Sequence, residues 1–165
     1  GKDTGMAEDK AITDICLDKS LKIRLSPDIE RERAIAMDDL LHHNRFHCSE
    51  FSAPYHVTLS LAEKCVRFHV KSANDNGQET HVDISLAPFR RLIKDYFLVC
   101  ESYYKVARQA SHAHIEAIDM GRRALHDEAA GLLKKRFLKH GIETDLPTAR
   151  RLFTLICVLH IRVMY

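Results

Sequence analysis

PFRRLIKDYFLVCESYYKVAR, residues 88–108, is the stretch that decides the fold. Its apolar side chains recur every three or four residues, which is the spacing of one face of an α-helix. Pro88 suits the first turn, where its missing N–H would have no intrahelical partner. The stretch therefore predicts an amphipathic helix, and the apolar segments elsewhere in the chain should pack on its inner face.

Three further segments carry helix patterns; they span residues 26–44, 111–141 and 145 onward. Each begins with a side chain that can cap a first turn, namely Ser26, Ser111 or Asp145. Gly141 supplies a C-terminal stop for the middle segment. Because residues 152–159 are nearly all apolar, we expect the last helix to be the most buried.

Heptad-like spacing gives the expected inner faces of two of these helices. For the first helix they are Ile29, Arg33, Ala36, Met37, Leu40 and Leu41; for the second they are Ile115, Ile118, Arg122, Leu125, Ala129, Leu132 and Arg136. An arginine on such a face needs a carboxylate partner, because a buried unpaired charge is costly.

Residues 55–86 carry three runs of alternating apolar and polar residues, which predict a three-stranded antiparallel meander with one apolar face. A three-residue turn at 75–77 keeps the alternation in step and puts Gly77 at a left-handed position. With a tight turn at 63–64, the expected rows on the polar face are Ser60–Arg67–Ser85, Thr58–His69–Asp83 and His56–Lys71–His81. Residues 12–17 and 21–25 predict one or two N-terminal strands.

The length of 165 residues suits one domain, so we expect a flexible tail at 1–10 and a single domain at 11–165. The fold class should be α+β, a small antiparallel sheet packed on one face by three to four helices. The polar N-terminus predicts no signal peptide, and no apolar run is long enough for a membrane span. Five cysteines without a C-x-x-C pair predict reduced thiols and a cytoplasmic location.

The two halves of the chain differ in charge. Residues 1–85 hold 11 Lys/Arg against 15 Asp/Glu, whereas residues 86–165 hold 14 against 8. Either the halves pair with each other, which we favour, or a basic helical face meets an anionic partner. The sequence pI of about 8.3 is lower than is typical of nucleic-acid-binding domains, so we do not favour nucleic acid as the partner.

Three stretches, FRRLIKDYFLVCESYY, IEAIDMGRRALHDE and ARRLFTLICVLHIR, follow an HVDISLAP strand in that order. Together they resemble uncharacterised protein family 0262 of the alphaproteobacteria, over nearly all of residues 11–162. The resemblance implies a small, one-domain bacterial cytoplasmic protein. It implies no activity and carries no catalytic residue or cofactor to this chain.

Two pairs of arginines fall in or near the first turn of a helix: Arg90 with Arg91, and Arg150 with Arg151. Cations at that end of the helix dipole are unfavourable by roughly 0.3–1 kcal/mol each, so something should offset them. A bound anion such as phosphate would do so. Ion pairs with carboxylates of the acidic half, such as Asp18, Asp38 or Asp39, would do so equally and are our favoured interpretation.

Arg122, Arg123 and His126 share one broad helical face with Asp119. One hypothesis is a buried ion pair between Arg122 and a carboxylate of a facing helix, such as Asp95. The other makes His126 a general base beside arginines that hold an anionic substrate. We favour the ion pair, because no nucleophile or recognisable loop accompanies the histidine.

Three histidines of the expected sheet, His56, His69 and His81, are the candidate metal ligands. Side chains on neighbouring strands stand parallel, which suits a polar face better than a tetrahedral site, so we expect no metal. We likewise expect no cofactor.

Two classes of function remain. We favour a non-enzymatic binding or adaptor protein that uses its basic helices on an unknown protein partner, alone or as a homodimer joined through a leftover apolar patch. The alternative is a small enzyme or sensor for a phosphate-bearing ligand. A pocket lined by at least three of Arg90, Arg91, Arg122 and Arg123, with His126 at its wall, would favour the alternative.

Overall fold

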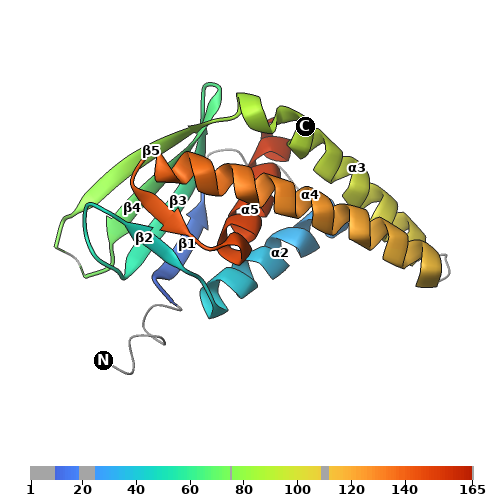
Figure 1. The fold of residues 1–165 in the computed structure, drawn as a ribbon, viewed down its shortest axis with the longest axis horizontal. Coiled ribbons are helices and arrows are strands. Elements are labelled where there is room, and N and C mark those ends of the chain that lie inside the picture. Colours follow the sequence, from blue (N-terminus) through green and yellow to red (C-terminus); the bar gives the residue numbers. More distant parts are fainter. Residues whose placement is uncertain (1–9, 19–24, 75, 109–111, 165) are drawn as a thin grey trace.

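The computed structural model describes residues 10–18, 25–74, 76–108 and 112–164 (Figure 1). The order of elements is β1 (Ile12–Leu17), α2 (Pro27–His42), β2 (Phe46–Cys48), β3 (Tyr55–Ala62), β4 (Cys65–Ser72), β5 (Glu79–Ser85), a 3-10 turn η1 (Ala87–Phe89), α3 (Arg90–Ala107), α4 (His112–Leu138), β6 (Ile142–Thr144) and α5 (Leu146–Met164). The predicted α+β class is confirmed. The predicted tail through residue 9, most of the strand at 21–25 and the cap at Ser111 lie outside the described residues.

The main sheet has the strand order β1-β3-β4-β5. Strands β3, β4 and β5 form the predicted antiparallel meander, whereas β1 runs parallel to β3. The prediction of a wholly antiparallel sheet was therefore wrong at β1. The reason is the connection: the chain passes through α2 between these strands, and such a crossover returns the next strand in the same direction.

The register of the meander was predicted correctly for one hairpin and wrongly for the other. Between β3 and β4, the pairs Ser60–Arg67, Thr58–His69 and His56–Lys71 are as expected. Between β4 and β5, the observed pairs are Arg67–Asp83, His69–His81 and Lys71–Glu79, two residues away from the prediction. An even shift keeps every side chain on its expected face, so alternation alone could not exclude it.

The longer connection explains that shift. The Ser72 N–H donates to the carbonyl of Gln78 at 2.9 Å, which closes the loop outside the predicted three-residue turn. Gly77 has a φ of 77°, so glycine does occupy a left-handed position, as predicted.

Helix α5 is the central helix, and it contacts α2, α3, α4 and β3 (Figure 1). All residues from 152 to 159 are buried, as the apolar run predicted. The predicted cap is also confirmed, since the Thr148 N–H donates to Asp145 Oδ1 at 2.9 Å. Gly141, with a φ of 75°, follows the end of α4 as expected.

Helices α3 and α4 form an antiparallel hairpin that extends away from the sheet (Figure 1). The buried residues of α3 lie on the predicted stripe. On α4 the buried set is Leu125, Ala129, Ala130, Leu133 and Phe137. The predicted inner position Leu132 is partly buried against the core, whereas Arg136 is not part of it, so that position was wrong. A strict heptad drifts by about 20° per repeat against a straight helix, which accounts for the error late in this helix.

The inner face of α2 departs from its predicted stripe in one important way. Its buried residues are Ile29, Glu32, Ala36 and Leu40. The expected positions Arg33 and Leu41 lie nearer the surface, and Arg33 forms an ion pair with Glu30. The face that meets the other helices therefore carries a carboxylate, not a guanidinium.

A two-stranded sheet of β2 and β6, which we did not predict, ties the end of α2 to the start of α5. The Arg45 N–H, just before β2, donates to Thr148 Oγ1 of α5 at 2.9 Å. This small sheet holds the last turns of α2 beside the first turns of α5, and the candidate site lies between them.

Candidate functional site

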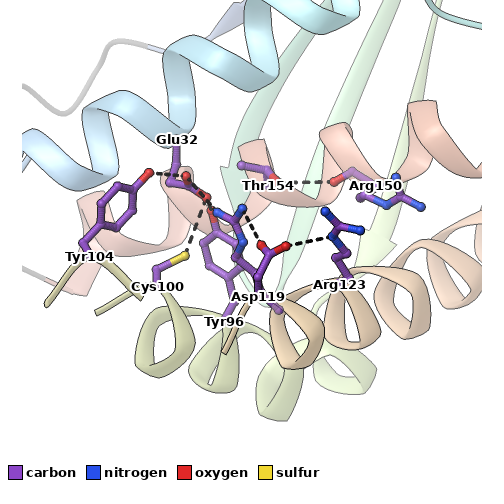
Figure 2. Close-up of polar contacts among 9 residues, drawn as sticks. Glu32, Tyr96, Cys100, Tyr104, Asp119, Arg123, Arg150 and Thr154 are labelled. Carbon is purple, nitrogen blue, oxygen red and sulfur yellow. Dashed lines mark hydrogen bonds and ion pairs between the residues drawn. The ribbon is translucent and has the colours of Figure 1, made fainter. Parts of the chain in front are cut away.

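Glu32 is a buried carboxylate at the junction of α2, α3 and α4, with 6% of the residue exposed. Its Oε1 accepts from the Tyr96 hydroxyl at 2.8 Å and from the Cys100 thiol at 3.6 Å. Its Oε2 accepts from the Tyr104 hydroxyl at 2.5 Å (Figure 2). The three donors recur every four residues along α3, so one face of that helix supplies the whole set.

Burial, together with the negative charge of Glu32, raises the pKa of all three donors. The pKa of Cys100 rises to about 12. The pKa values of Tyr96 and Tyr104 also rise, in each case chiefly because burial disfavours the phenolate. These groups therefore stay protonated and donate hydrogen bonds, and the Cys100 thiol is no nucleophile at neutral pH.

Arg122 of α4 supplies the positive charge at this junction. One guanidinium nitrogen lies 3.4 Å from Glu32 and another lies 3.1 Å from Asp119, in the preceding turn. The guanidinium also stands 4.4 Å from the centre of the Tyr103 ring, a cation–π contact. The hypothesis that Arg122 is paired agrees with this geometry, but its predicted partner Asp95 was wrong.

A pocket of about 150 Å³ opens beside this junction, between α2, α4 and α5. It is lined by Glu32, Ile35, Ala36 and Asp39 from α2, by Arg122 and His126 from α4, and by Arg150, Arg151 and Thr154 from α5. Three of the six candidate arginines thus converge with His126 on one concave surface.

Three nitrogen atoms of residues that line the pocket are buried and have no hydrogen-bond partner within the described part of the chain: His126 Nε2, Arg150 Nε and Arg151 Nε. Other nitrogens of both arginines are engaged, since Arg150 pairs with Asp127 at 2.7 Å and Arg151 donates to the Pro147 carbonyl at 2.9 Å. Arg151 Nε lies 3.3 Å from Asp39 Oδ2, which is an ion-pair distance without the alignment of a hydrogen bond.

Burial, followed by the positive charge of Arg122, lowers the pKa of His126 to about 4. The imidazole is therefore neutral at physiological pH, with its ring against those of Tyr96 and Phe153. A general base works best when its pKa is near the operating pH, so the hypothesis that His126 abstracts a proton loses support. A neutral imidazole nitrogen can still donate or accept a hydrogen bond.

The remaining arginines do not line the pocket. Arg90 is exposed at the start of α3, and Arg91 pairs with Asp95 at 3.2 Å and with Glu128 at 2.6 Å. Arg123 is exposed and pairs with Asp119 at 2.9 Å (Figure 2). The six arginines therefore divide into three in the pocket and three at the surface. Of the four arginines expected at the ligand site, only Arg122 lines the pocket, so that expected set was wrong, and Arg150 and Arg151 line it instead.

The candidate metal ligands do not converge. His69 and His81 stack with ring centres 4.6 Å apart, and His69 Nε2 lies 3.2 Å from Glu79. His56 stands one row away, opposite Lys71. Across residues 10–18, 25–74, 76–108 and 112–164, no group of three or more His, Cys, Asp or Glu side chains is placed to hold a metal ion.

Sequence reasoning missed Glu32 and Thr154. The signal for Glu32 was present on α3, where Tyr96, Cys100 and Tyr104 put three polar tips on an otherwise apolar face. Such tips need a buried acceptor, because buried donors are almost always hydrogen-bonded. Nothing in the sequence distinguishes Thr154, whose hydroxyl donates to the Arg150 carbonyl at 3.3 Å (Figure 2).

Residues 9–162 match the model of an uncharacterised protein family, UPF0262. The chain belongs to this family. A UPF0262 protein of Brucella canis is 48% identical over 153 residues, which are 92% of this chain and 94% of the relative. UPF0262 proteins of Rhizobium etli, at 46% over 157 residues (94% and 98%), and Rhodospirillum rubrum, at 48% over 151 residues (92% of each), are similarly related. No solved structure matches the chain.

These relatives are alphaproteobacterial proteins, as the resemblance of the three motifs implied, and their names assign no activity. Among the described residues, no helix has both the length and the apolar character required to cross a membrane.

Proposed function

We propose that this protein binds a small phosphate-bearing ligand in the pocket between α2, α4 and α5. One observation carries the proposal: three arginines and His126 line the same pocket, and three of their nitrogen atoms are buried without hydrogen-bond partners. A buried donor left unpaired costs about 1–3 kcal/mol, so a ligand that accepts hydrogen bonds there would recover that free energy.

The chemistry of guanidinium groups supports an oxoanion as this ligand. Each guanidinium presents five N–H donors in a planar fork that fits phosphate or carboxylate oxygens. Arg150 and Arg151 use only part of their donors on Asp127, Asp39 and the Pro147 carbonyl. The ion pairs within the chain therefore orient these side chains and leave donors for a ligand.

The size of the pocket supports a small buried group. A cavity of about 150 Å³ can hold benzene, which has six heavy atoms, whereas sites for drug-sized molecules occupy about 300–1,000 Å³. A phosphate group has five heavy atoms, so it fits inside the pocket. Any larger part of the ligand would extend outward into solvent.

Binding without chemistry is better supported than catalysis at this site. The Cys100 thiol, with its pKa raised to about 12, contacts Glu32 and is no nucleophile. His126, with its pKa lowered to about 4, is a poor general base. The lining thus offers donors that hold an anion, and the hydroxyl of Thr154 is engaged with the Arg150 carbonyl.

The test is a thermal-shift titration with inorganic phosphate and phosphorylated metabolites. A ligand at a hundred times its dissociation constant stabilises by about 2.7 kcal/mol, which raises the Tm of a chain of this size by about 5–10 °C. Arg150→Gln combined with Arg151→Gln should abolish the shift. Arg90→Gln combined with Arg91→Gln is the matched control, because it removes two arginines from the same part of a helix outside the pocket.

A flat titration, or an equal loss in both double variants, would contradict the proposal. The adaptor class would then take its place, and a pull-down would be the next experiment. Circular dichroism of each variant verifies that the helices remain folded.

A further inference from the structure

The pocket contains one carboxylate that a ligand could use as a hydrogen-bond acceptor. Both oxygens of Glu32 are already engaged by Tyr96, Cys100, Tyr104 and Arg122. Asp39 lines the same pocket, and within the described part of the chain it forms one ion pair, with Arg151. A carboxylate accepts about four hydrogen bonds, so Asp39 retains acceptor capacity toward the pocket.

A carboxylate beside three arginines distinguishes between anions of similar size. An oxoanion that carries a proton can donate an O–H hydrogen bond to Asp39 while its other oxygens accept from the arginines. An oxoanion without a proton instead places a bare oxygen against the carboxylate, and like charges at that distance repel. At neutral pH inorganic phosphate carries at least one proton and sulfate carries none.

We infer that Asp39 is a specificity-determining residue that selects a protonated phosphoryl group, above all inorganic phosphate, over sulfate. This inference rests on the proposed function and names the form of its ligand. His126 does not make the same distinction, because a neutral imidazole nitrogen can meet either an O–H donor or a bare oxygen.

A phosphate monoester is the second source of the same chemistry. Its second pKa is about 6, so at neutral pH most of the ester has lost the proton that would form the hydrogen bond to Asp39. Methyl phosphate should therefore bind less tightly than inorganic phosphate at neutral pH, although it has the same core of oxygens. A phosphate-binding site without a selective acceptor would treat the two alike.

Isothermal titration calorimetry at neutral pH, with phosphate, sulfate and methyl phosphate, tests the inference. A hydrogen bond to a charged acceptor predicts that wild-type protein binds phosphate at least about tenfold more tightly than sulfate. In Asp39→Asn the side-chain amide can donate to a bare oxygen and the negative charge is gone, so the two affinities should come within about twofold of each other. The two affinities should converge chiefly because the variant binds sulfate more tightly than wild-type protein does.

Asp38→Asn is the matched control. Asp38 precedes Asp39 on α2, has a 71% exposed side chain that pairs with His42, and does not line the pocket. This variant makes the same change in net charge, and it should keep the wild-type preference for phosphate.

The outcomes separate the inference from the proposed function. Equal binding of phosphate and sulfate by wild-type protein, methyl phosphate bound as tightly as phosphate, or an unchanged preference in Asp39→Asn would overturn the role of Asp39 while anion binding stands. Failure of all three anions to bind, or binding that survives Arg150→Gln with Arg151→Gln, would contradict the proposed binding site itself.

Discussion

Glu32 joins three helices through four donors, and this makes it the polar centre of the helical layer. A buried carboxylate needs this many partners because its desolvation costs several kcal/mol. The same residue lines the pocket, so the network that orders α2, α3 and α4 also fixes one wall of the candidate site.

Replacing Glu32 should therefore lower the free energy of unfolding more than replacing a surface carboxylate. We expect Glu32→Ala to lower the free energy of unfolding by about 3–5 kcal/mol, because it leaves the donors of α3 without their acceptor and Arg122 with Asp119 alone. Urea denaturation measures the loss. Glu101→Ala, at an exposed position of α3, is the control and should stay within about 0.5 kcal/mol of wild type. A loss below about 1 kcal/mol in Glu32→Ala would contradict this account of the network.

His126 should respond directly to an anion in the pocket. Burial and Arg122 hold its pKa at about 4 in the unliganded protein, and a negative charge beside the ring would favour the imidazolium form and raise that pKa. An NMR titration of the imidazole signals, with and without phosphate, measures both values. No upward shift should occur in Arg150→Gln with Arg151→Gln. A pKa near the ordinary 6.5 without ligand would show that the ring is solvated.

Helical elements of this chain were predictable because their signals are local. The stripe of α3, the caps Ser26 and Asp145 and the stop at Gly141 each depend on a few neighbouring residues. The β4–β5 register was not predictable to the residue, because side-chain alternation cannot distinguish shifts of two. Strands β2 and β6 have three residues each and are distant in sequence, so no local sequence pattern predicts them.

The candidate site was predictable in part for the same reason. Arg122, Arg150, Arg151 and His126 stand out as charged or titratable groups on helices, but their convergence depends on how α2, α4 and α5 pack. Glu32 was missed because a helical stripe is assigned by apolar residues, whereas its place in the core is set by donors on α3.

Helix α5 depends on its cap for the position of its first turns, which hold Arg150 and Arg151. Asp145→Ala removes the acceptor for the Thr148 N–H, and we expect it to lower the free energy of unfolding by about 1 kcal/mol. Asp145→Asn keeps a capping oxygen, so it should lower the free energy of unfolding much less. Urea denaturation of both variants measures the difference, and equal losses would show that the charge of Asp145, not its hydrogen bond, stabilises the helix.

At the scale of the whole molecule, the fold separates a polar sheet surface from a buried polar site among the helices. The sheet face presents ion pairs such as Arg67–Asp83 to solvent, where they contribute little to stability. The helical layer instead buries Glu32 and partly buries Arg122 and His126 at the wall of the pocket. The pH dependence of folding near neutrality should therefore come from the helical layer.

His126 sets the sign of that dependence. Its folded pKa of about 4 lies below the ordinary 6.5, so the unfolded chain binds more protons between these values and the protein loses stability as pH falls from 6.5 to 4. The full contribution is on the order of 3 kcal/mol, and it is present above pH 6.5. His160, whose pKa is lowered chiefly by burial and also by Arg90, adds a loss of the same sign.

Urea denaturation across this pH range, for wild type and His126→Asn, measures the contribution of one ring. The asparagine cannot take up a proton, so the variant should lose less stability than wild type on acidification, and the remaining slope should include the part due to His160. Asp83, whose pKa is lowered by the Arg67 hydrogen bond, loses its contribution only at more acidic pH, below its ordinary value of 3.8. Parallel curves for wild type and variant would mean that His126 titrates alike in the folded and unfolded chain, and the buried site would then be open to water.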